Sequence, residues 1–122
     1  MDYRFFYNER QIPTARLSMD HEALGLWLSD ELGSDKEQLH HILQVISQLE
    51  NGERREFEWQ GRDFLLYLTR DDAEVTALTL LQEYSREELE GEDLDFYDSE
   101  SRAACGLEDF KDLLLEWQEF LE

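Results

Sequence analysis

The sequence predicts an α+β fold: a mainly antiparallel sheet of about five strands, in the order ββααβββα, with helices packed on one face. The 122 residues are 41% hydrophobic and 12% aromatic, which is typical of one globular domain. Apolar residues recur at helical spacing in three segments and alternate with polar residues in several others. Short polar turns join consecutive strand-like segments, which favours antiparallel pairing. We therefore expect a single domain over residues 1–122, with an acidic irregular segment at 83–100.

The first two strands are predicted at Asp2–Tyr7 and Thr14–Met19. The stretch "NERQIP" between them is polar and holds the chain's one proline, Pro13. This pattern predicts a hairpin in which Pro13 lies at the start of the second strand, where a missing N–H is tolerated.

A first helix is predicted in "SMDHEALGLWLSDELG", residues 18–33. Its apolar residues at helical spacing are Leu24, Trp27, Leu28 and Leu32. Ser18 or Asp20 can cap its start, and Gly33 can end it. Gly25 weakens such a helix by about 1 kcal/mol relative to alanine, unless close packing needs the space.

A second helix follows directly. Ser34 and Glu37 have the S-x-x-E spacing of a capping box, and "ENG" at 50–52 ends the segment. The predicted buried stripe consists of Leu39, Ile42, Leu43, Ile46 and Leu49.

The middle of the chain changes to a period of two. In "REFEWQ", Phe57 and Trp59 share one face. The next strand, "RDFLLYLTR", is apolar on both faces, so it should be central or covered on its second face by a partner. After a turn at Asp71–Asp72, "AEVTALTLL" predicts a third strand, and the three form an antiparallel meander.

The chain ends in a predicted amphipathic helix. Its apolar stripe, at i, i+3, i+7, i+10 and i+14, is Leu107, Phe110, Leu114, Trp117 and Leu121. Glu108 and Asp109 lie in its first turn, where carboxylates interact favourably with the helix dipole.

Charge is the unusual property of this chain. It has 31 acidic and 11 basic residues, a net charge of −20, of which −6 falls in residues 1–61 and −14 in residues 62–122. Such a field repels phosphate backbones and anionic membranes, so neither direct nucleic-acid binding nor membrane binding is expected. It favours fast, salt-sensitive encounter with cationic partners.

The expected location is the cytoplasm. Cys105 is the single cysteine, so no internal disulfide can form, which fits a reducing compartment. The N-terminus lacks the pattern of a signal peptide, and no apolar run approaches the length of a membrane span.

No catalytic, cofactor-binding or metal-ligating residues are predicted. An EF-hand loop opening at Asp93 fails at Tyr97, Asp98 and Ala104. His40 and His41 are adjacent, so they point in different directions on a helix. Cys105 precedes the last helix, but nearby carboxylates disfavour a reactive thiolate, and it is interpreted as a small residue packed at the helix entry.

The leading functional hypothesis is a non-enzymatic interaction protein that docks on a basic protein surface. Residues 83–100 hold nine acids and one base. The candidate partner-binding residues are Glu87, Glu88, Glu90, Glu92, Asp93, Asp95, Phe96, Tyr97 and Asp98. In the simpler alternative, Phe96 and Tyr97 pin a solvated loop to the sheet. Two further alternatives are a small carboxylate-based or divalent-metal enzyme and a homodimer formed through the two-faced strand Phe64–Leu68.

Three stretches, "MDYRF", "LSMDHEALGLW" and "FYDSESRAACGLEDF", resemble the YacL family of small acidic gammaproteobacterial proteins. The resemblance spans essentially the whole chain, and the last stretch is the most specific. It implies a cytoplasmic bacterial protein. Because that family is itself uncharacterised, it implies no catalytic or ligand-binding residues.

Overall fold

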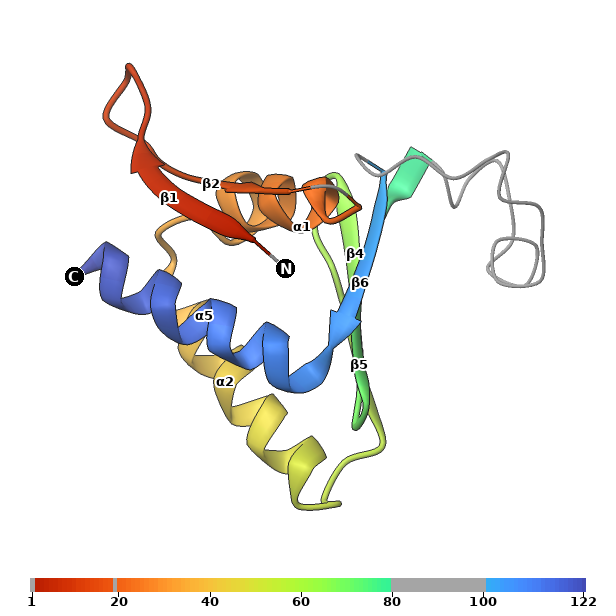
Figure 1. Cartoon of the computed structure of the whole chain (residues 1–122). Coiled ribbons are helices and arrows are strands. Elements are labelled where there is room, and N and C mark those ends of the chain that lie inside the picture. Colours follow the sequence, from red (N-terminus) through yellow and green to blue (C-terminus); the bar gives the residue numbers. More distant parts are fainter. Residues whose placement is uncertain (1, 19, 80–100) are drawn as a thin grey trace.

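The structure is a computed structural model that describes residues 2–18, 20–79 and 101–122. The described residues form two antiparallel sheets, with the helices on one side of the larger sheet (Figure 1). The two-stranded sheet pairs β1 (Tyr3–Tyr7) with β2 (Pro13–Leu17), and the larger sheet has the order β3 (Glu56–Gln60), β4 (Phe64–Thr69), β5 (Asp72–Ala77), β6 (Arg102–Gly106). The helices are α1 (Glu22–Leu26), the π-helical η1 (Trp27–Leu32), α2 (Lys36–Glu50) and α5 (Leu107–Leu121). The predicted α+β class is confirmed, and the predicted order ββααβββα matches roughly. The one sheet expected is divided into two among the described residues, because the β1–β2 hairpin pairs only with itself.

The described residues contain six strands rather than about five, because β6 was not predicted. Its sequence, "RAACG", is made mostly of small residues and has no alternating pattern. The strand exists because β5 pairs with it, with Ala103 opposite Val75 and Cys105 opposite Ala73. Helix α1 packs against both β5 and β6, so small side chains on β6 leave room for that helix.

All three predicted helices are present, but the N-terminal caps of the first two differ from those expected. Residues 22–32 continue from α1 into η1 and end at Gly33, which has a φ of 54°. The cap position of α1 is His21, and no side chain caps it, whereas the Ser18 hydroxyl accepts from the Asp2 N–H at 3.3 Å. On α2 the cap is Asp35, which accepts from the Gln38 N–H at 3.1 Å, one residue after the predicted Ser34.

Gly25 lies where helix α1 meets strand β2. A Cβ atom at this position would lie 2.9 Å from the Ala15 carbonyl oxygen and 3.3 Å from the Leu17 side chain. Beside it, the Ser29 hydroxyl accepts from the Ala15 N–H at 2.8 Å and donates to the Gly25 carbonyl at 2.8 Å. The α1–η1 segment therefore covers the outer edge of β2, and its Ser29 hydroxyl provides a hydrogen-bond acceptor for the Ala15 N–H there.

The core fills the space between the larger sheet, the helices and the hairpin. Trp27 is fully buried, with its ring 5.6 Å from Phe110 and 6.1 Å from Trp59. Trp117 is also fully buried, and its indole N–H donates to the Gly33 carbonyl at 2.8 Å. The two tryptophans thus link η1 to α5, and Trp27 also links η1 to the larger sheet.

Glu31 joins η1 to the turn between β3 and β4. Its carboxylate accepts hydrogen bonds from the backbone N–H groups of Arg62 at 3.0 Å, Phe64 at 3.1 Å and Asp63. The carboxylate occupies the space where a Cβ atom at Gly61 would lie. The turn therefore depends on a side chain about thirty residues earlier in the sequence.

Replacing Gly25 with alanine tests the close packing of α1 on β2. Although alanine favours a helix by about 1 kcal/mol, we expect Gly25→Ala to lower the free energy of unfolding by about 1–3 kcal/mol, because the methyl group would press on the Ala15 carbonyl. Urea unfolding measures the change. Ser47→Ala on the exposed side of α2 is the control and should leave stability equal or slightly higher.

Replacing Glu31 with glutamine tests the tie to the β3–β4 turn. We expect Glu31→Gln to lower the free energy of unfolding by about 1–3 kcal/mol, because an amide N–H₂ group would face a backbone N–H group. The neighbouring exposed Asp30→Asn removes the same charge and should change stability by less than about 0.5 kcal/mol. Equal effects of the two variants would mean that the loss comes from charge rather than from these hydrogen bonds.

Candidate interaction surfaces

Helix α5 carries a continuous row of carboxylates on its exposed side. Its buried residues are Leu107, Phe110, Leu113, Leu114 and Trp117. Since these positions fill one side of the helix, the charged residues all lie on the other side. We call this exposed set the acidic row: Glu108, Asp109, Asp112, Glu116, Glu119 and Glu122.

Two further side chains define the character of the acidic row. Lys111, the one basic residue on α5, forms an ion pair with Glu50 of α2 at 3.2 Å, so its charge is already compensated. Leu115 lies within the row and is 40% exposed. The row thus combines uncompensated negative charge with an apolar contact point.

The charge of the described residues is not divided as the sequence halves suggest. Residues 62–79 and 101–122 hold ten acids and four bases, a net of −6, which equals the net of residues 1–61. The larger difference in net charge is between the β1–β2 hairpin and the other described residues. Residues 2–18 carry +1, whereas the other described residues carry −13.

The predicted partner-binding residues lie outside the described residues. All nine, from Glu87 to Asp98, fall within residues 80–100, so the acidic tract keeps only its sequence-based interpretation. The acidic row on α5 is the carboxylate surface that the described part of the chain does position.

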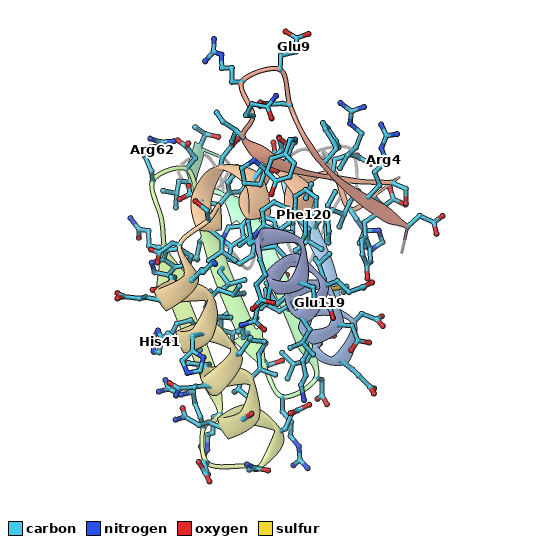
Figure 2. All side chains as sticks on the ribbon, turned by 90° about the vertical axis from the view of Figure 1, so that its left-hand side faces the viewer. Arg4, Glu9, His41, Arg62, Glu119 and Phe120 are labelled. Atoms are coloured by element: carbon cyan, nitrogen blue, oxygen red, sulfur yellow. The ribbon has the colours of Figure 1, made fainter. Side chains whose placement is uncertain are left out.

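The face of the hairpin away from α5 is basic and aromatic. The guanidinium carbons of Arg4 and Arg16 each lie 5.4 Å from the centroid of the Phe6 ring. In Figure 2, Arg4 projects from this face, whereas Phe120 lies between the hairpin and α5. The opposite face packs on α5, with Phe5 5.0 Å from Trp117 and Tyr7 4.9 Å from Phe120.

Strand β4 is central in the larger sheet, as its two apolar faces predict. Phe64, Leu66 and Leu68 are buried against the helices, while Leu65 and Tyr67 are half-buried on the outer face. Elsewhere on that face Arg102 and Glu74 form an ion pair at 2.9 Å, with 23% and 16% of the side chains exposed. Both edges of β4 are occupied by β3 and β5, so strand addition cannot occur there.

Surface grooves lie at the hairpin and beside α5. One of about 530 Å³ runs between β2 and the α1–η1 segment, where Ile12 and Leu26 are 46% and 40% exposed. A second, of about 490 Å³, is lined by polar groups that include Arg70, Asp71 and Asp109. A third, of about 580 Å³, lies at the hairpin turn beside Phe6 and Arg10. In the first groove the Thr14 and Ser29 hydroxyls donate to the backbone carbonyls of Ile12 and Gly25 and not to a carboxylate, so neither is paired with a base.

Cys105 is held as a neutral thiol. It lies in β6, two residues before α5 begins, and not at the helix start itself. Burial, with further contributions from the charges of Asp109 and Asp72, raises the pKa of Cys105 from about 9 to about 12. The side chain is therefore a poor nucleophile near neutral pH.

The histidines do not converge in the described part of the chain. His41 lies edge-on to Phe57 with ring centroids 5.8 Å apart, whereas His40 lies 3.4 Å from the amide nitrogen of Gln44. Among the described residues, no three histidine, cysteine or acidic side chains are grouped so as to hold a metal ion. Nor does any described helix combine the length and apolar composition that a membrane crossing requires.

Sequence reasoning missed both surfaces that the described residues present. The acidic row was present in the sequence as acids at i, i+4, i+8 and i+11 from Glu108, but only the apolar stripe of that helix was used. The basic hairpin face was also readable, because Arg4, Phe6 and Arg16 fall on one side of a two-stranded pattern. Without the pairing register, however, their contact was not evident.

These features define a small, strongly acidic α+β protein with a carboxylate-lined helix and a weakly basic hairpin, and with no assembled reactive centre among the described residues. The chain belongs to the uncharacterised protein family UPF0231, whose family model matches residues 1–121. Its relatives include a UPF0231 protein of Shewanella baltica, 44% identical over 88% of this chain and 86% of the relative. A UPF0231 protein of Vibrio cholerae is 43% identical over 88% of this chain and 83% of the relative.

A third relative, from Shewanella sp. strain MR-4, is 39% identical over the whole of this chain and 98% of its own length. The expectation of an uncharacterised family with gammaproteobacterial members is therefore confirmed, although the relatives carry the name UPF0231 and not YacL. None of these relatives carries the name of an enzyme. No solved structure matches the chain.

The raised pKa of Cys105 predicts a thiol that is protected in the folded chain. At pH 8 we expect iodoacetamide to alkylate Cys105 at least about 100-fold more slowly in the folded chain than in urea, because little thiolate is present. Since the folded pKa exceeds the unfolded value, the thiol's contribution to stability is complete below about pH 9 and is lost as the pH rises toward 12.

The exposed neighbouring position, Ala104, supplies a control for this measurement. Ala104→Cys in a Cys105→Ser background should react at nearly the rate of an unfolded thiol, because its side chain is exposed. Fast alkylation of Cys105 in the folded wild-type chain would contradict the assignment.

Proposed function

We propose that this protein is a non-enzymatic interaction or accessory protein that docks an acidic surface on a basic surface of another protein. The acidic row on α5 carries the proposal, because it is a row of aligned, exposed carboxylates and the one basic residue of that helix, Lys111, is paired with Glu50. A cytoplasmic setting forms part of the proposal, since the single cysteine, Cys105, forms no internal disulfide.

The spacing of the acidic row suits an extended or helical basic partner. Glu108, Asp112 and Glu116 are each four residues apart, so they rise along the helix in steps of about 6 Å. The exposed Leu115 beside them supplies an apolar contact point in addition to the charges. Exposed charges at the margin of an interface mainly accelerate and orient association, so the binding should weaken as salt increases.

The acidic tract extends the same field along the chain. Residues 83–100 add nine acids and one base, and the carboxylates from Glu87 to Asp98 remain the candidate partner-binding residues. Phe96 and Tyr97 serve in this proposal either as anchors of the tract or as the centre of the contact. Phosphate backbones are not expected partners, because the net charge of −20 repels them.

A defined basic peptide tests the proposal directly. We expect an oligolysine peptide to bind the wild-type chain in calorimetric titrations, with an affinity that falls steeply between about 0.01 M and about 1 M salt. The double variant Asp112→Asn, Glu119→Gln should bind about tenfold more weakly, since two exposed charges facing the peptide are lost.

The matched control removes the same charge elsewhere. Glu37→Gln, Glu53→Gln changes two exposed acids whose side chains make no hydrogen bond or ion pair among the described residues, and should alter the affinity by less than about threefold. If the two double variants weaken binding equally, the net charge alone governs the interaction and α5 is not a docking surface. If the wild-type chain does not bind oligolysine at low salt, acidity serves solubility only.

A further inference from the structure

Within the part of the chain that the structure describes, the outer edge of strand β1 pairs with no other strand. In an antiparallel pair, residues alternate between those whose backbone groups face the partner strand and those whose groups face away. The hydrogen bonds from Ser18 N–H to the Asp2 carbonyl and from Asn8 N–H to the Ile12 carbonyl show that even-numbered residues of β1 face β2. The backbone groups of Tyr3, Phe5 and Tyr7 therefore point away from β2, and no hydrogen bond among the described residues occupies them.

The two edges of the hairpin differ in this respect. At the outer edge of β2, the Ser29 hydroxyl satisfies the N–H of Ala15, and α1 covers the strand. Beside the outer edge of β1, by contrast, Figure 1 shows no further strand among the described residues. An uncovered edge strand is a template for pairing with another chain, and natural proteins normally block such edges.

We infer that β1 pairs with β1 of a second copy of this chain, giving a two-fold symmetric dimer with a continuous sheet in the order β2-β1-β1-β2. The register follows from the outward-facing residues. Pairing all three of them places Phe5 opposite Phe5 of the second copy and Tyr3 opposite Tyr7, and it uses the full length of the strand.

The side chains of β1 are complementary to themselves in this register. On the face toward α5, the two copies bring aromatic residues together as cross-strand pairs, and Tyr7 is 51% exposed before pairing. On the other face, Arg4 meets Phe6 of the second copy at a non-hydrogen-bonded position, where side chains approach most closely. Within one chain Arg4 already makes a cation–π contact with the Phe6 ring, and the dimer adds a second contact of the same kind.

The charge distribution makes the hairpin the described surface at which two copies of this acidic chain repel one another least. The hairpin is the described region with a slight positive charge, +1 against −13 for the remainder, so a contact between hairpins keeps the acids of both copies outside the interface. The two chains still repel through their net charges of −20 each. Since salt screens that repulsion and does not weaken backbone pairing, the dimer should strengthen with salt. This dependence has the opposite sign to the binding of a basic partner.

Sedimentation velocity on the full chain tests the inference. We expect a monomer–dimer equilibrium whose association constant rises by about tenfold between about 0.01 M and about 1 M salt, as the Debye length falls from about 30 Å to about 3 Å. A strict monomer at every salt concentration, or a dimer that dissociates as salt is added, overturns the proposal.

Two pairs of variants locate the interface. Arg4→Glu should lower the association constant by about tenfold at high salt, because two symmetric cross-strand contacts are lost. Arg70→Glu makes the same charge change in the β4–β5 turn and should alter it by less than about twofold. Equal losses of affinity from the two variants overturn the proposal. An unchanged association constant in Arg4→Glu also overturns it, and would place any dimer at another surface, such as the outer face of β4.

A proline variant tests the strand edge itself. Tyr7→Pro removes an N–H that faces away from β2, so the hairpin's own ladder is kept while the outer edge is blocked. Its association constant should fall further than that of Tyr7→Ala, which loses the same ring but keeps the N–H. Circular dichroism establishes that both variants are folded. If Tyr7→Pro and Tyr7→Ala associate equally, the edge of β1 is not the site of pairing. If Tyr7→Pro does not fold, the comparison of Arg4→Glu with Arg70→Glu decides the question.

Discussion

The hydrogen bond from the Trp117 indole to the Gly33 carbonyl is the interaction on which the rest of the arrangement depends. Trp117 is fully buried, so its N–H must find an acceptor, and the carbonyl at the end of η1 supplies one at 2.8 Å. The same ring contacts Phe5 and Phe120. One side chain thus fixes α5, the end of η1 and the hairpin relative to one another, although these elements are far apart in the sequence.

This anchoring determines how the charge is displayed. Because α5 is held by one buried stripe, its acids cannot be distributed around the helix and are gathered on the opposite side as the acidic row. The hairpin is held over the same helix by Phe5 and Tyr7, so its arginines face outward on the far side. A strongly acidic chain therefore presents an acidic helix and a weakly basic strand pair on separate surfaces.

The same packing explains why one edge of the hairpin is closed and the other is open. Gly25 lets α1 approach β2 closely enough for Ser29 to bond the backbone of Ala15. No equivalent helix lies against β1 in the described part of the chain, because α5 passes under the face of the hairpin and not beside its edge (Figure 1). Among the described residues, a surface rich in aromatic side chains thereby lies next to backbone groups without a partner, a combination that favours association between chains.

The sequence alone determined the α+β class, the helices, the hairpin and the central position of β4, because each depends on local periodicity or on a turn residue such as Gly33. Tertiary structure decided the rest. Strand β6 has no pattern of its own and is formed by pairing with β5, while the Asp35 cap and the Glu31 tie depend on local geometry and on a contact about thirty residues away. The predicted site at Glu87–Asp98 rested on composition, which counts charges without giving them positions. The acidic row and the open edge of β1 could be recognised only once buried faces and strand register were known, since burial decides which side chains and backbone groups remain exposed.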